Sequence, residues 1–140
     1  MAHYAEFVNN TPDQHSLFLA LDRISEKPVP RGAYEVILRK FLVPDEFVHL
    51  AFDGNGWTFL DPLLLVTDRR ILRLREGVFG GWAKRGEVPA ADVMGASVTR
   101  WILFGAVNVH ARNGQSFRVH YNLEDEAQVF VEGLNRLIGR

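Results

Sequence analysis

The sequence contains no cysteine among its 140 residues. Disulfide bonds and thiolate chemistry are therefore excluded, and because the composition suits a reducing compartment we expect a cytoplasmic protein. No stretch approaches the roughly 18 uninterrupted apolar residues of a membrane-spanning helix, and residues 1–10 lack the basic start and apolar run of a secretory signal peptide. We expect a protein that neither spans a membrane nor is secreted by that route.

A large excess of charge of either sign is also missing. The formal net charge is -1 at pH 7, with 24% charged and 47% hydrophobic residues. These values are typical of a globular domain with one core, and they provide no overall attraction to nucleic acid. We therefore expect no nucleic-acid partner, and any attraction to an anionic surface must come from a local patch.

Patterns that carry catalysis or bind metals are likewise scarce. The five histidines show no metal-ligand spacing, no glycine-rich loop leads from a strand into a helix, and no serine or carboxylate pair lies in a catalytic motif. We expect no catalytic residues, no metal, no cofactor and no enzymatic activity.

The first 44 residues have helical patterns. Thr11 followed by Pro12 is a helix-start signal, and apolar residues at helical spacing predict a helix over about 12–25. A second apolar stripe, from Ala33 to Phe41, predicts another helix that Pro44 ends. Residues 1–44 are therefore expected to form an N-terminal helical extension.

From Glu46 the pattern changes to short runs of β-branched and aromatic residues separated by turn signals. Seven strands are predicted: Glu46–Phe52, Thr58–Val66, Arg70–Arg75, Trp82–Val88, Val93–Trp101, Gly105–Ala111 and Gln115–Tyr121. Pro62 is the least regular point of this set, because proline belongs at a strand edge or bulge.

The last hairpin has a predictable register. A three-residue loop, 112–114, pairs Val109 with Phe117, whereas a two-residue turn would pair Val109 with Arg118 and separate the apolar faces. We therefore predict the longer loop, with Gly114 at the position that needs a left-handed backbone.

The chain ends in a strongly amphipathic helix. Asn122 is expected to cap it, and acidic residues in its first turn and Arg136 near its end suit the helix dipole. One continuous apolar stripe is predicted to close the barrel: Ala127, Phe130, Val131, Leu134, Leu137 and Ile138.

Four segments of the β-rich part resemble the bacterial YokE-like PH domains in order and spacing. The segments are Leu42–Glu46, Leu63–Leu72 with the letters TDRR, Glu76–Gly80 and Glu87–Val93. The resemblance implies a fold that is mainly β with α: a PH-like seven-stranded antiparallel barrel or sandwich capped by a C-terminal helix, preceded by one or two N-terminal helices. Residues 1–44 would be the extension and 45–140 the PH-like domain, in one structural unit.

The same resemblance implies a non-catalytic binding or scaffolding module without a cofactor. Lipid-binding PH domains of eukaryotes typically carry a lysine in the first strand, but Glu46–Phe52 holds no Lys or Arg. We therefore expect a protein partner or self-association first. The alternative is peripheral binding to anionic lipid through a basic strand face.

Two groups of residues are candidates for such binding. Strand alternation places Arg73 and Arg75 outward, opposite to Leu72 and Leu74, which predicts a basic face or, alternatively, an ordinary solvated surface. This candidate basic face comprises Arg69, Arg70, Arg73, Arg75, Lys84 and Arg85. The candidate aromatic interface lies at turns and comprises Phe79, Trp82, Trp101 and Phe104, which could instead fold back over the barrel ends.

The outer face of the second and third strands is also apolar. Leu64, Val66 and Ile71 are expected to point away from Leu65 and Leu72. An amphipathic helix buries its stripe on a complementary face, so we predict that the N-terminal helices cover these three residues, with a second subunit as the alternative.

Overall fold

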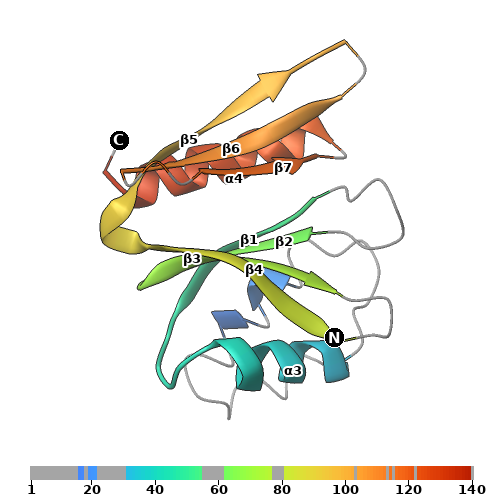
Figure 1. Cartoon of the computed structure of the whole chain (residues 1–140), viewed down its shortest axis with the longest axis vertical. Helices are drawn as coiled ribbons and strands as arrows, with labels where there is room; N and C mark the ends of the chain where they lie inside the picture. The colour runs from blue at the N-terminus through green and yellow to red at the C-terminus, as the bar shows by residue number, and fades with distance from the viewer. Residues whose placement is uncertain are drawn as a thin grey trace.

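Two antiparallel sheets and a C-terminal helix form the β-rich part of the chain, as the computed structural model shows (Figure 1). The structure describes residues 16–17, 19–21, 31–54, 62–76, 81–102, 104–112, 114, 116–121 and 123–139. The first sheet has the order β1 (Val48–Asp53), β2 (Pro62–Thr67), β3 (Arg70–Glu76) and β4 (Trp82–Pro89). The short 3-10 turn η1 (Ala90–Asp92) leads into the second sheet, β5 (Val93–Arg100), β6 (Gly105–Ala111) and β7 (Ser116–His120). The predicted seven-stranded fold is confirmed.

Both hairpins with a predicted register have that register. Val66 pairs with Ile71 across the β2–β3 turn, and Val109 pairs with Phe117 across the β6–β7 loop. Gly114 has a φ of 82°, the left-handed conformation that the three-residue loop requires. Pro62 is the first residue of β2, a position where its missing N–H disturbs no ladder.

Strand β2 in the first sheet is buried on both faces. All six residues of β2 are buried, so one face meets the core between the sheets and the other meets the N-terminal residues. The outer core combines Leu17, Leu21 and Ile37 with strand residues that include Leu65, Leu72 and Leu74. Ile37 belongs to α3 (Arg31–Phe41), which lies below the first sheet in Figure 1.

The prediction for these faces is therefore wrong by one position. Leu64, Val66 and Ile71 lie in the core between the two sheets, not under the N-terminal helices. The N-terminal residues cover the opposite face, with Leu65 and Leu72. A strand that is apolar on both sides has no polar residue to mark its outside, so alternation alone assigned the parity arbitrarily.

Helix α4 (Glu124–Leu137) closes the side of the sandwich between β5 and β1. Its buried residues are Ala127, Phe130, Val131 and Leu134, and the Phe130 ring packs 5.2 Å from that of Phe52. The helix begins after Leu123, which makes no side-chain cap hydrogen bond, so the predicted cap at Asn122 is wrong and that residue lies outside the described ranges. Leu137, expected in the apolar stripe, is 47% exposed.

The two sheets meet closely at the end of β1. A Cβ atom added to Gly54 would lie 2.2 Å from Cγ1 of Val119 and 2.8 Å from the backbone oxygen of His120. Only a glycine fits this close approach of two backbones. The corner therefore places the end of β1 beside the end of β7.

Candidate functional site

Arg70, a member of the predicted basic face, is neutralised inside the structure. Its guanidinium forms ion pairs with Glu46 and Glu87, and it also donates a hydrogen bond to the backbone oxygen of Phe41 at the end of α3. The Arg70–Glu46 distance is 2.9 Å, and the arginine side chain is only 18% exposed. Arg70 therefore connects the first sheet to the N-terminal extension and is not available to a partner.

Glu46 is the fully buried member of this network. Burial alone would raise the pKa of its carboxyl, but hydrogen bonds from Arg70 and Thr67 hold that pKa below its ordinary value. The hydroxyl of Thr67 donates to Glu46 at 2.6 Å, and the backbone N–H of Val43 donates at 3.1 Å. The buried carboxylate is thus fully engaged in holding the fold.

Two further members of the predicted basic face also have partners. Lys84 lies 3.5 Å from a carboxylate oxygen of Glu87, and Arg69 donates to the backbone oxygen of Pro44 at 3.5 Å. Both side chains are at the surface, where such contacts contribute little to stability. The six predicted basic residues therefore do not form one face.

The remaining three form a group that we call the arginine cluster: Arg73, Arg75 and Arg85. Burial, followed by the charges of Arg75 and Arg85, lowers the pKa of Arg73. In the described part of the chain, the ion pairs include no carboxylate partner for any of the three guanidinium groups. Like charges therefore crowd together here at a cost to folding.

The arginine cluster does not point to the outside of the sandwich as predicted. Arg73 and Arg75 lie on the same side of β3 as Ile71, which faces the core between the sheets, and both are half-buried. Along β3, Arg73 pairs with Gly86 of β4, and Arg75 pairs with Pro62 of β2. The sides of β2 and β3 were predicted together from one hairpin register. The error that reversed the sides of Leu64, Val66 and Ile71 therefore also reversed the predicted sides of Arg73 and Arg75.

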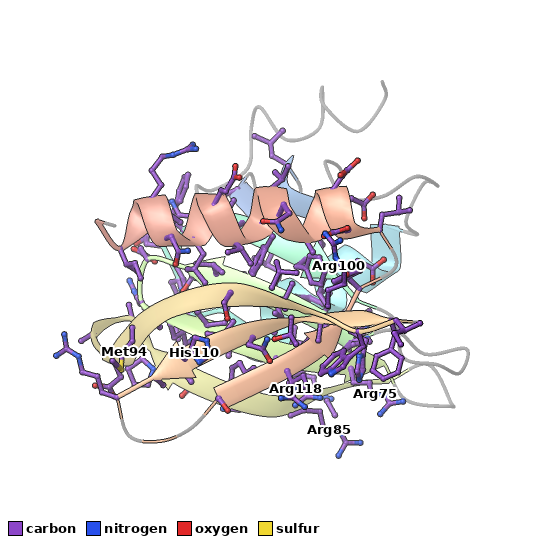
Figure 2. The ribbon with its side chains drawn as sticks, turned by 90° about the horizontal axis from the view of Figure 1, so that it is seen from above. Arg75, Arg85, Met94, Arg100, His110 and Arg118 are labelled. Atoms are coloured by element: carbon purple, nitrogen blue, oxygen red, sulfur yellow. The ribbon has the colours of Figure 1, made fainter. Side chains whose placement is uncertain are left out.

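Arg118 of β7 joins this end of the molecule from the second sheet. A Cβ atom added to Gly86 would lie 2.6 Å from the ring of Phe117, so β4 and β7 are in contact beside Arg85 and Arg118. Figure 2 shows Arg75, Arg85 and Arg118 gathered at one end of the sandwich, with Met94 and His110 at the other. Three strands thus contribute guanidinium groups to one end.

An apolar turn lies next to Arg118. The guanidinium of Arg118 lies 5.4 Å from the ring centroid of Trp101, and the Trp101 and Phe104 rings are 4.8 Å apart. Between them in the β5–β6 turn, Ile102 is 100% exposed, and Phe104 is 41% exposed. We call the side chains of Trp101, Ile102 and Phe104 the tip.

Trp82, another of the predicted aromatics, does not join the tip. Trp82 packs against the outer core, and its backbone oxygen accepts a hydrogen bond from Lys40 at 2.6 Å. Phe79 lies outside the described residues. Of the four predicted aromatics, the structure brings together Trp101 and Phe104.

Two residues of this surface were missed in the sequence. Ile102 lies in a turn where small or polar residues are usual, and that departure was the available signal. Arg118 occupies a polar position of the alternating strand Ser116–His120, but nothing local indicates that it faces Trp101 from across the sheet. The assembled surface combines exposed apolar groups with positive charge, which suits an acidic or anionic partner with an apolar contact.

Metal binding and membrane spanning find no support in the described residues. Among them, no three His, Cys, Asp or Glu side chains are grouped so that they could hold a metal ion. Within the same ranges, no helix has the length and apolar character needed to cross a membrane.

Comparison with known proteins gives one match. The sequence model of a family described as a bacterial PH domain matches residues 42–136, which is more than half of the chain. No curated protein and no solved structure matches the chain. The matched range begins at the loop before β1 and ends in the last turn of α4, so it spans both sheets.

Proposed function

The chain belongs to the bacterial PH domain family, and we propose that it is a non-catalytic module that binds a protein partner through the tip and the neighbouring arginine cluster. PH domains are generally binding modules without catalytic activity, and they commonly mediate interactions with proteins or lipids. The proposal names the class of partner and the surface. The division at residue 44 and the cytoplasmic location stay predictions.

One observation carries the proposal: a completely exposed isoleucine at the end of a hairpin, beside positive charge. An isolated exposed apolar side chain is ordinary, but here Ile102 lies next to two aromatic rings and Arg118. Aromatic and arginine side chains are enriched among the residues that dominate protein interfaces. The tip has this composition.

Acidic residues near the tip favour a protein over a membrane. Glu124 forms an ion pair with Arg100 at the base of the β5–β6 turn, and Asp125 and Glu126 follow in the same helical turn. Asp53 ends β1, which contains no Lys or Arg. An anionic membrane surface would repel these carboxylates, whereas a protein partner can match a mixed pattern of charge.

Anionic lipid is the second candidate, because the arginine cluster has no carboxylate partner among the ion pairs of the described residues and the tip is an exposed apolar turn. Each basic residue near an anionic bilayer contributes about 1 kcal/mol of attraction. A protein–lipid contact of this kind weakens as salt increases. The salt dependence of vesicle binding is therefore a measurement that tests the lipid candidate.

Affinity capture from the native host, paired with vesicle co-sedimentation, separates the two candidates. We expect the wild-type protein to retain a discrete protein, and we expect Ile102→Glu and the double variant Arg75→Glu with Arg85→Glu to lose it. Met94→Glu is the matched control, since Met94 is 42% exposed at the opposite end (Figure 2). Wild-type vesicle binding that requires anionic lipid and is lost in the double variant would replace the proposal with the lipid candidate. Capture that survives both tip-end variants would contradict it.

A further inference from the structure

An apolar groove lies between α4 and β1. It encloses about 310 Å³, and its walls are mainly apolar side chains from both elements, including Leu50, Phe52, Val129 and Phe130. Val129 is 69% exposed, although four other apolar residues of the same helix, Ala127, Phe130, Val131 and Leu134, are buried. The groove thus exposes apolar surface that folding of this helix leaves uncovered.

The rim of the groove is acidic. Asp125 and Glu126 from α4 line it, and both are exposed. Glu124, one residue earlier, is already paired with Arg100. A partner that fits this groove therefore carries an apolar side chain surrounded by positive charge.

The tip of this same chain has that chemistry. Ile102 is fully exposed, so it does not occupy the groove of its own molecule, and Arg118 lies beside it against the Trp101 ring. The tip and the groove are thus complementary in charge and in apolar character.

The tip and the groove are also neighbours on the molecule. The Arg100–Glu124 ion pair joins the base of the β5–β6 turn to the first turn of α4, next to the acidic rim. The close approach of Gly54 to His120 brings the Asp53 end of β1 beside the tip, because the ring of His120 lies 5.5 Å from that of Phe104. Two copies related by a two-fold axis can therefore place each tip in the groove of the other copy.

We propose that the groove between α4 and β1 receives the tip of a second copy of this chain, with Ile102 of one copy against Val129 of the other. This inference rests on the proposed function, because it identifies the partner of the tip. The contact joins two different surfaces of the chain, so a variant in one surface leaves the other surface intact.

Sedimentation velocity on the full chain tests the inference through mixing. We expect the wild-type protein to associate with increasing concentration above its monomer mass of 15.9 kDa. Ile102→Glu and Val129→Glu should each raise the Kd by at least about tenfold, since each places a charge where an apolar side chain is buried. An equimolar mixture of the two variants retains one intact tip–groove contact and should associate more strongly than either variant alone.

Two control variants, one further test variant and a folding check accompany this experiment. Met94→Glu and Leu137→Glu are the controls: they change residues that are 42% and 47% exposed, and both should associate like the wild type. The pair Asp125→Lys with Glu126→Lys should weaken association, because it reverses the acidic rim. Thermal unfolding of every variant shows whether it is folded.

Three results would overturn the inference: a wild type that stays monomeric at every concentration, tip or groove variants that associate normally, or a mixture no stronger than its components. If the wild type is monomeric while Ile102→Glu still abolishes capture of another protein, the proposed function stands and only this inference fails. If Ile102→Glu changes neither measurement, both fail.

Discussion

Arg70 and Arg73 are three residues apart on the same strand and have opposite situations. Arg70 has two carboxylate partners and a backbone acceptor, and its hydrogen bonds to Glu46 and Glu87 raise its pKa above the ordinary value. Arg73 is also half-buried, but burial and two neighbouring arginines lower its pKa, and no ion pair in the described residues includes it. One arginine stabilises the fold, while the other is retained at a cost.

The role of each arginine therefore depends on the groups that contact its guanidinium, and not on its position in a run of basic residues in the sequence. Arg70 meets Glu46 and Glu87 because the loop before β1 and the end of β4 converge on the β2–β3 turn. Arg73 lies further along β3, where it pairs with Gly86 of β4 and where neither Glu46 nor Glu87 forms an ion pair with it. We therefore include the arginine cluster in the proposed binding surface.

The largest expected effect is at Arg70. Arg70→Ala leaves the buried Glu46 carboxylate without its ion pair, and breaking such a pair from one side costs about 3–5 kcal/mol of unfolding free energy. Urea unfolding measures this loss. Arg69→Ala is the matched control in the same turn, and it should cost less than about 0.5 kcal/mol because its side chain is exposed. Equal losses in the two variants would contradict the role of Arg70.

A smaller effect is expected from acid. The folded-state pKa of Glu46 is below the ordinary value of 4.5, so the unfolded chain takes up the proton first as pH falls. Stability from this group is therefore complete above about pH 4.5 and is lost as pH falls through the folded-state pKa. Unfolding curves from about pH 7 to about pH 3 should fall more steeply for the wild type than for Glu46→Gln. Identical slopes would exclude Glu46 as a source of acid sensitivity.

The sequence predicts most of this fold because its local signals are strong. The β6–β7 register follows from alternation and Gly114, and α4 follows from an uninterrupted apolar stripe. Its first boundary was misplaced by expecting Asn122 as the cap, although Leu123 occupies that position. Local patterns thus determine the elements better than their ends.

The candidate site was predictable only in part. Trp101 and Phe104 were recognised because large aromatic residues are unusual at turns, and the structure brings them together. Glu87 was recognisable as a residue that could balance the basic run, but the pairing of Arg70 with the buried Glu46 was not, because the two are 24 residues apart in the sequence. Which side of β3 faces the core also depends on tertiary packing, since both sides of its partner β2 are buried.

The central claim is that the arginine cluster serves binding and not folding. The triple variant Arg73→Gln, Arg75→Gln and Arg85→Gln tests it most directly when the free energy of unfolding and partner capture are measured on the same protein. We predict that stability stays within about 1 kcal/mol of the wild type or rises, since mutual repulsion is removed, while capture is lost. A loss of stability of about 3 kcal/mol, the size expected at Arg70, with capture intact would contradict the claim.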